Sequence, residues 1–364
     1  MEIRILRITS KFGIAILIIA MISLFSCNVS KKTSTESMEE IGYNTKGIKQ
    51  KKRSLIIGES QAICYSGFRT GQHPDRGDGA VNPSAEEVFE DLQIIRDQLG
   101  IRLIRMYDVG DNTQMVLETI RKHNMDIKVM LGVWLKAELS AHETCAWLNE
   151  PIPEEVLQNN KELNLKEIDK GIQLAREYND IIVAVSVGNE ALVEWNDHKV
   201  DTDTIISYVH KVKNSIKQKV TVADNYDWWA NHGEELAKAV DYVSIHIYPV
   251  WEGRGIEDAM PYSIENIRKV MDALPKSQIV ITEAGWATTA SEFGHRASEA
   301  NQTRYYKELM SFADVMNITT FWFEAFDEDW KGNPDNPIGA EKHWGVYKVD
   351  RSPKEVVKYI IDNK

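Results

Sequence analysis

Two glutamates follow short apolar runs that are typical of buried strands. Glu190 ends the segment SVGNE at 186–190, and Glu283 follows the run IVIT at 279–282. A carboxylate at the tip of a buried strand costs free energy unless it is paired or used. Cleavage of a glycosidic bond needs two carboxyls, one to protonate the leaving oxygen and one to attack the anomeric carbon. Each glutamate alone is equally well explained as a salt-bridged strand end, so the prediction of chemistry depends on the pair.

The elements that must position this pair are eight apolar, β-branched runs separated by amphipathic helical patterns. A repeated strand–helix unit predicts an α/β fold of the (β/α)8 TIM barrel type, in which all strand ends point to one mouth. A doubly wound sheet is the alternative, but the first strand is followed by YSGF rather than a glycine-rich phosphate turn. The predicted strands cover residues 62–68, 101–107, 127–134, 181–187, 220–223, 242–247, 279–282 and 319–323.

The helical patterns are marked by capping residues and by apolar spacing. Ser84 and Glu87 form a capping box, and Gly100 ends the apolar face that follows. The same spacing recurs at Ile205, Val209, Val212 and Ile216, and at Ile264, Ile267, Met271 and Leu274.

Four motifs at the predicted strand ends carry a family resemblance. They are VGNE at 187–190, EAGW at 283–286, FEAFDE at 323–328 with Lys331, and EKHWGVY at 341–347. In this order they resemble glycoside hydrolase family 17, the β-1,3-glucanases and glucan transferases, over nearly all of the predicted barrel. The resemblance implies that Glu190 is the acid/base and Glu283 the nucleophile of a retaining hydrolysis of β-1,3-glucan through a covalent glucosyl–enzyme intermediate.

The resemblance also implies roles for neighbouring residues. Asn189 should hydrogen-bond the sugar 2-hydroxyl, and Tyr248 should donate to Glu283, with a packed rim tyrosine as the alternative. His246 is predicted to be a buried, hydrogen-bonded residue rather than a ligand. A network under the substrate is expected from Glu324, Glu328 and Lys331, although a plain Glu328–Lys331 salt bridge explains those two residues equally well.

Aromatic residues are frequent, with ten tryptophans and thirteen tyrosines. Aromatic faces stack on sugar rings, so several of those near strand ends are expected to line a glucan cleft, while others pack the core. Arg105 and Asp108 are candidates for binding hydroxyls at the rim, or for a salt link inside the barrel. The aromatic candidates are Tyr65, Tyr107, Trp134, Trp228, Trp229, Trp251, Trp286, Trp322 and Trp330.

Rival functions share parts of this pattern. A β-1,3-glucan transglycosylase would use the same site, and no residue decides between water and a sugar as acceptor. A non-catalytic surface glycan-binding lipoprotein would be expected to have lost one of the two glutamates. A metal-dependent hydrolase would need a His-x-His motif in the first strand, which reads AICYS. The sequence therefore predicts neither a metal nor another cofactor, and segments 251–261 and 332–343 are candidates for shaping an endo or exo cleft.

The N-terminal segment has the features of a bacterial lipoprotein signal. Arg4, Arg7 and Lys11 precede the apolar run 12–25, which ends at Cys27 in LFSC, a sequence that resembles a lipobox. Residues 1–26 are therefore predicted to be a signal peptide and 27–53 a lipidated, flexible tether, with partial ordering on the barrel as the alternative. The catalytic domain is expected at 54–364, held at the cell envelope as a membrane-anchored lipoprotein.

Net charge and cysteines restrict the partners further. A net charge of −12 argues against binding nucleic acid through phosphates and suits a neutral β-glucan chain. Cys64 and Cys145 are either a disulfide or two free thiols, because spacing alone does not fix their distance.

Overall fold

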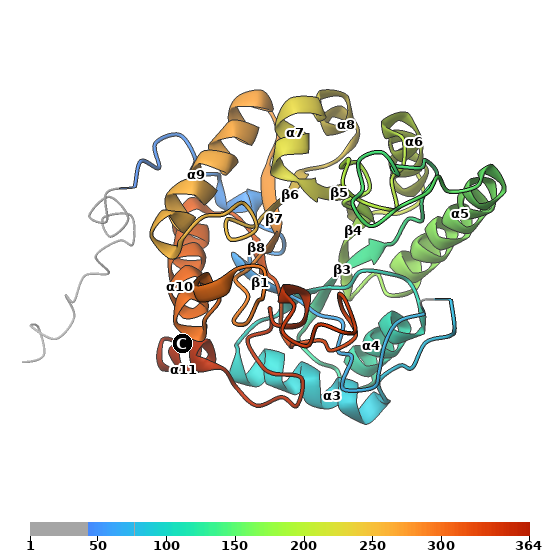
Figure 1. Ribbon diagram of the computed structural model, residues 1–364. Coiled ribbons are helices and arrows are strands. Elements are labelled where there is room, and N and C mark those ends of the chain that lie inside the picture. Colours follow the sequence, from blue (N-terminus) through green and yellow to red (C-terminus); the bar gives the residue numbers. More distant parts are fainter. Residues whose placement is uncertain (1–42, 76) are drawn as a thin grey trace, which may run out of the picture. The chain divides into compact units, whose positions relative to one another are not determined.

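The computed structural model describes residues 43–75 and 77–364, and the unit from Thr45 to Lys364 contains a closed parallel barrel (Figure 1). The strands pair in chain order, and β1 closes the barrel on β8 with Ala62 opposite Phe321. This confirms the predicted (β/α)8 fold. The strands are β1 Gln61–Cys64, β2 Leu103–Arg105, β3 Lys128–Val133, β4 Ile182–Asn189, β5 Lys219–Asn225, β6 Val243–Ile247, β7 Ile279–Ala284 and β8 Thr320–Trp322.

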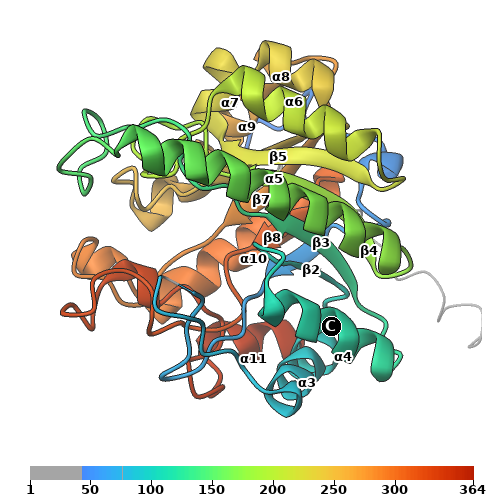
Figure 2. The same cartoon turned by 90° about the vertical axis from the view of Figure 1, so that its right-hand side faces the viewer.

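Helices surround the barrel and cover the outer faces of the strands (Figure 1). Viewed from the side, the long loop after β3 and the loops after β8 project on the left, where the strands end (Figure 2). The helices are α3 Ala85–Gln93, α4 Asp111–Lys122, α5 Glu154–Glu177, α6 Thr202–Lys213, α7 Tyr226–His232, α8 Glu234–Ala239, α9 Ile256–Ala273, α10 Glu299–Met316 and α11 Glu355–Asp362. Short helical turns are η1 Lys52–Ser54, η2 Ile94–Gln98, η3 Gly294–Arg296 and η4 Ala340–Lys342.

The helices begin where the capping residues predict, but their ends are less regular. Both hydrogen bonds of the capping box between Ser84 and Glu87 are present at the start of α3. The chain continues past α3 through the π-helical turn η2 and leaves it at Gly100, whose φ is +73°. Ile216, which was predicted to continue the face of α6, lies beyond the helix end at Lys213.

The segment 45–53, predicted to belong to the tether, is packed on the barrel. Ile48 is buried, and the Gln50 side chain donates to the carbonyl oxygen of Ile279 and accepts from its amide, both at 2.8 Å. This matches the alternative of partial ordering for these residues. The predicted signal peptide, Cys27 and most of the predicted tether lie outside the described residues. Among the residues that are described, no helix is long and apolar enough to cross a membrane.

The two cysteines of the barrel unit are free thiols. Cys64 and Cys145 are both buried, so the disulfide alternative is not the arrangement found. Burial raises the pKa of the Cys64 thiol to about 12, although the charge of Arg105 acts in the opposite direction. The thiol is therefore neutral.

A buried ion pair holds the loop after β1. Asp91 of α3 accepts from Arg351 at both carboxylate oxygens, at 2.8 and 2.6 Å, and from Arg69 at 2.9 Å. Tyr65 donates to the same carboxylate at 3.2 Å and is almost fully buried. The prediction that Tyr65 stacks on substrate is therefore wrong, because strand β1 ends at Cys64 and the Tyr65 side chain is directed into the packing against α3.

Replacing Arg351 by methionine should destabilise the barrel strongly. Removing one partner of a buried pair leaves an uncompensated charge, and we expect the free energy of unfolding to fall by about 3–5 kcal/mol in urea titrations. The matched control is Arg304→Met, which removes a two-bond pair with Glu257 at the surface. An equal loss in both variants would contradict the structural role of the buried pair.

Candidate active site

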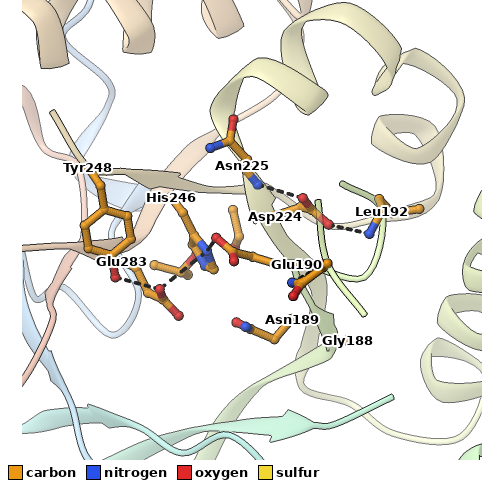
Figure 3. A network of polar contacts seen from close by, with 12 residues as sticks. Gly188, Asn189, Glu190, Leu192, Asp224, Asn225, His246, Tyr248 and Glu283 are labelled. Atoms are coloured by element: carbon orange, nitrogen blue, oxygen red, sulfur yellow. Dashed lines mark hydrogen bonds and ion pairs between the residues drawn. The ribbon is translucent and has the colours of Figure 1, made fainter. Parts of the chain in front are cut away.

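Glu283 lies inside the mouth of the barrel and accepts hydrogen bonds from three side chains at the ends of two other strands, β2 and β6. Its Oε1 accepts from Arg105 Nη1 on β2 at 2.7 Å and from Tyr107 at 3.0 Å. Its Oε2 accepts from the Tyr248 hydroxyl, just past β6, at 2.7 Å (Figure 3). The donation from Tyr248 is the contact expected from the sequence, whereas Tyr107, a candidate for sugar stacking, binds the carboxylate of Glu283. A carboxylate held by this many donors is fixed in position and favoured in its ionised form.

The electrostatics of Glu283 follow from these contacts. Burial alone raises the pKa of a carboxyl, but the neighbouring imidazole of His246, the charge of Arg105 and the hydrogen bonds from Tyr248 and Tyr107 outweigh it. The pKa of Glu283 is therefore lowered, and its carboxylate is ionised over the neutral range. An ionised carboxylate can act as a nucleophile or as an ion-pair partner.

Glu190 has a different environment at the end of β4. Its Oε1 lies 2.8 Å from Nδ1 of His246 on β6. Its side chain is 23% exposed, against 7% for Glu283. Glu190 adopts the left-handed conformation with φ +45°, which costs a non-glycine residue about 1–3 kcal/mol. The amide of Glu190 donates to Ala223, and its carbonyl oxygen accepts from Asn196, which hold the strained backbone in place.

Shifts in strand register determine the direction of the side chains at the barrel mouth. Between β4 and β5, Ser186 pairs with Thr221, but the next pair is Asn189 with Ala223, so β4 holds one extra residue. Between β6 and β7, the register shifts in the same way just before the pair of His246 and Glu283. An extra residue in one strand re-aims side chains that would otherwise alternate between the two faces of the sheet. The irregularities therefore lie at the strand ends that supply the polar side chains of the mouth.

The two glutamates and His246 converge. One atom from each of Glu190, His246 and Glu283 can be chosen so that all three lie within 4.8 Å of one another. The geometry of a retaining glycosidase places its carboxyls about 5 Å apart. These atoms are also of the types that bind metals, but Arg105 donates to Glu283 from inside the barrel. A fixed cation at this distance disfavours a second cation in the same place.

Asn189 is oriented by the same arginine. Its Oδ1 accepts from Arg105 Nη2 at 2.6 Å, which leaves its side-chain NH2 group as a donor for a ligand hydroxyl. Arg105 itself is buried, and Nη1 also donates to the carbonyl oxygen of Thr282. The prediction that Arg105 binds hydroxyls at the rim is therefore wrong, and the alternative of an interior salt link is the arrangement found. Asp108 accepts from the backbone of Gly110 at the start of α4.

Glu324, Glu328 and Lys331 form one hydrogen-bonded network, and its expected place under the substrate stays a prediction. Lys331 Nζ lies 2.7 Å from Glu324 Oε2 and 2.6 Å from Glu328 Oε2, and Ser66 donates to Glu328. Burial and the neighbouring Glu328 charge raise the pKa of Glu324 well above its usual range, although Lys331 opposes them. The lysine and hydrogen bonds hold the pKa of Glu328 low despite burial. Glu328 is therefore the ionised carboxylate of this pair, and Glu324 is protonated. Both side chains are almost completely buried.

Several of the candidate aromatic residues belong to the core. Trp229, Trp286 and Trp322 have no exposed surface. The indole of Trp286 donates to the carbonyl oxygen of Arg296, and Trp322 packs edge-on against Tyr306 of α10. The prediction that these three tryptophans line a sugar cleft is wrong, because Trp286 and Trp322 pack between the barrel and α10, and Trp229 of α7 packs its indole against β6 and donates to the carbonyl oxygen of Ser244.

Other aromatic side chains are accessible near the mouth. Trp251 is exposed and packs edge-on against Phe293, and Trp134 is half-buried and packs at a tilt against the ring of His198. Trp228 and Trp330 are also half-buried. Sequence reasoning did not select Trp147 and Trp195, which are exposed on the loops after β3 and β4. Their loop positions carry no periodic signal that separates them from ordinary surface residues.

Asp224 is a site residue that the sequence could have revealed. It lies near the end of β5, is fully buried, and accepts from the amides of Leu192 and Asn225 (Figure 3). Burial and the Glu190 charge raise its pKa well above the usual range. The rule that selected Glu190 and Glu283, an acid at the tip of an apolar strand, applies equally to Asp224. Its bond to Leu192 ties β5 to the loop that follows Glu190.

Comparison with known proteins places this site in a family context. The model of the BtgE/BtgC glycoside hydrolase domain matches residues 62–345. A glucan 1,3-beta-glucosidase of Arthroderma benhamiae is 26% identical over 83% of this chain and 94% of its own length. A protein of Aspergillus niger named as a glucan endo-1,3-beta-glucosidase, btgC, is 26% identical over 76% of this chain. The chain spans only 40% of the length of that second relative.

Solved structures share the fold. An endo-laminarinase from Formosa Hel1_33_131 is 26% identical with a TM-score of 0.70, covering 83% of this chain and 86% of its own. A glycoside hydrolase family 17 beta-1,3-glucanosyltransferase from Rhizomucor miehei is 22% identical with a TM-score of 0.61, covering 84% and 97%. The family match over residues 62–345, in a barrel whose mouth holds two facing glutamates, shows that this chain belongs to the family of the BtgE/BtgC glycoside hydrolase domain, in agreement with its resemblance to glycoside hydrolase family 17.

Proposed function

We propose that this chain is a retaining glycoside hydrolase that cleaves β-1,3-glucan. The single observation that carries the proposal is the approach of the Glu190 and Glu283 carboxyls within 4.8 Å. At this separation the second carboxylate reaches the anomeric carbon itself, whereas an inverting enzyme needs a wider gap for a water molecule. The names of the Arthroderma and Aspergillus relatives support a β-1,3-linked glucan as substrate.

The proposed mechanism assigns opposite tasks to the two glutamates. Ionised Glu283 attacks the anomeric carbon while Glu190 gives a proton to the departing oxygen, which forms a covalent glucosyl–enzyme. Glu190 then takes a proton from water, and the water oxygen displaces Glu283. Arg105, Tyr107 and Tyr248 hold the nucleophile in place and ionised. The free NH2 group of Asn189 donates to the 2-hydroxyl of the sugar that reacts.

Substituting Glu283 by glutamine should abolish turnover of laminari-oligosaccharides. The amide keeps the shape of the side chain but removes the nucleophile, so we expect kcat to fall by about 10⁴-fold or more. Glu235→Gln on α8 is the matched control, because it removes an exposed glutamate remote from the site. Undiminished activity of Glu283→Gln, measured by product chromatography, would rule out the proposed nucleophile.

The same chromatograms address the transglycosylase alternative, which uses the same two glutamates. If a sugar hydroxyl replaces water in the second step, products longer than the substrate appear at high substrate concentration. Hydrolysis alone yields only shorter products. We expect shorter products to dominate with a β-1,3-linked substrate, and β-1,6-linked and mixed-linkage glucans serve as the comparison.

Substituting Tyr248 by phenylalanine should shift the pH profile. The Tyr248 hydroxyl helps to lower the pKa of Glu283, so its removal raises that pKa. Because Glu283 must be ionised to attack, the acid limb of the kcat/KM profile should move to higher pH. Tyr208→Phe is the control, since it removes a tyrosine–glutamate hydrogen bond on α6 of similar length, 2.6 Å. An unmoved acid limb in Tyr248→Phe would contradict this assignment.

The location of the enzyme is a separate proposal that depends on the N-terminal sequence. We propose that Cys27 is lipidated and anchors the barrel at the cell envelope, on the outer membrane. In a bacterial host, Cys27→Ser should move the protein from the membrane fraction to the soluble fraction. Mass spectrometry of the N-terminal peptide should find acyl chains on the wild type only, and an unmodified wild-type cysteine would refute the anchor.

A further inference from the structure

His246 is a fully buried side chain that touches both glutamates and the arginine of the site. Its Nδ1 lies 2.8 Å from Glu190 Oε1 and 3.5 Å from Glu283 Oε2 (Figure 3). Its Nε2 lies 3.3 Å from Nη1 of Arg105. The mechanism above gives His246 no task, although both of its ring nitrogens are engaged in a site without exposed imidazole surface.

These contacts determine which nitrogen of the imidazole carries hydrogen. A guanidinium has only donors and stays protonated, and Nη1 already donates to Glu283 and Thr282, so the Nε2 atom that faces it must present a lone pair rather than a hydrogen. The imidazole is then neutral with its hydrogen on Nδ1. A doubly protonated ring would set an N–H against the N–H of Arg105. Nδ1 therefore donates, and its partner at 2.8 Å is Oε1 of Glu190.

We propose that His246 is a positioning residue that selects Oε2 of Glu190 as the atom that delivers the proton. This inference rests on the proposed glycosidase function. Because Oε1 accepts the hydrogen on Nδ1, the carboxylic proton of Glu190 resides on Oε2. The hydrogen bond also fixes the rotation of the carboxyl group, so Oε2 keeps one orientation toward the leaving oxygen. General acid catalysis depends on such alignment.

Two substitutions separate the donor from the rest of the ring. In His246→Asn the side-chain amide nitrogen takes the place of Nδ1 and can still donate to Glu190 Oε1. In His246→Leu the side chain has similar bulk but no donor. Both variants lose the Nε2 acceptor for Arg105, which retains Thr282 and Glu283 as partners. Differences between Asn and Leu therefore report the donation to Glu190.

The test compares two aryl β-laminaribiosides that differ only in the leaving group. Phenol leaves with the help of an acid, whereas 2,4-dinitrophenolate leaves without a proton. For His246→Leu we expect kcat/KM for the phenyl substrate to fall by about 10²-fold. For the dinitrophenyl substrate we expect kcat/KM to fall by about tenfold at most. His246→Asn should recover about tenfold of the loss on the phenyl substrate.

Equal losses on both substrates, or an Asn variant as impaired as the Leu variant, would overturn the proposal. Circular dichroism and urea unfolding of both variants show whether the fold is retained, and the Asn variant keeps the test available if Leu does not fold. Wild-type protein that releases neither phenol would refute the glycosidase function itself. That outcome is distinct from any difference between the His246 variants.

Discussion

The site depends on one buried guanidinium. Arg105 reaches from β2 across the interior of the barrel to Glu283, Asn189 and His246, at 2.7, 2.6 and 3.3 Å. A charge in this position is costly to bury unless its partners are fixed and complementary. The same contacts therefore stabilise the ionised nucleophile, orient the amide of Asn189 and set the tautomer of His246. One cation thus links three strand ends, and loss of its charge would alter all three together.

Backbone irregularity is the second requirement of the geometry. A regular strand would send Asn189 and Glu190 to opposite faces, but both have partners inside the mouth. The shift in register on β4 and the left-handed conformation of Glu190 make this arrangement possible. Asp224 and Asn196, which bind the backbone on the far side of Glu190, hold it there. The free energy stored in this turn is offset by the regular packing of the surrounding barrel.

Much of the fold and the centre of the site could be predicted from the sequence. The eight strands follow from apolar runs, and the facing pair follows from Glu190 and Glu283 at strand ends, because parallel strands of a barrel share one mouth. The roles of Tyr65, Trp322 and Arg105 could not be predicted in this way. Whether a strand-end side chain faces the mouth, the barrel interior or the helices depends on register shifts and loop directions, which the residue pattern does not encode. Gly188 was the only local signal of the irregular turn before Glu190, with φ +84°.

The stereochemistry of the first product tests the central claim most directly. Hydrolysis of a β-1,3-glucan oligosaccharide can be followed by proton NMR from the first seconds, before the product anomers equilibrate in water. With two carboxyls close enough for direct attack by Glu283, we expect the new reducing end to appear first as the β anomer. Initial appearance of the α anomer would mean a single displacement by water and would contradict the account.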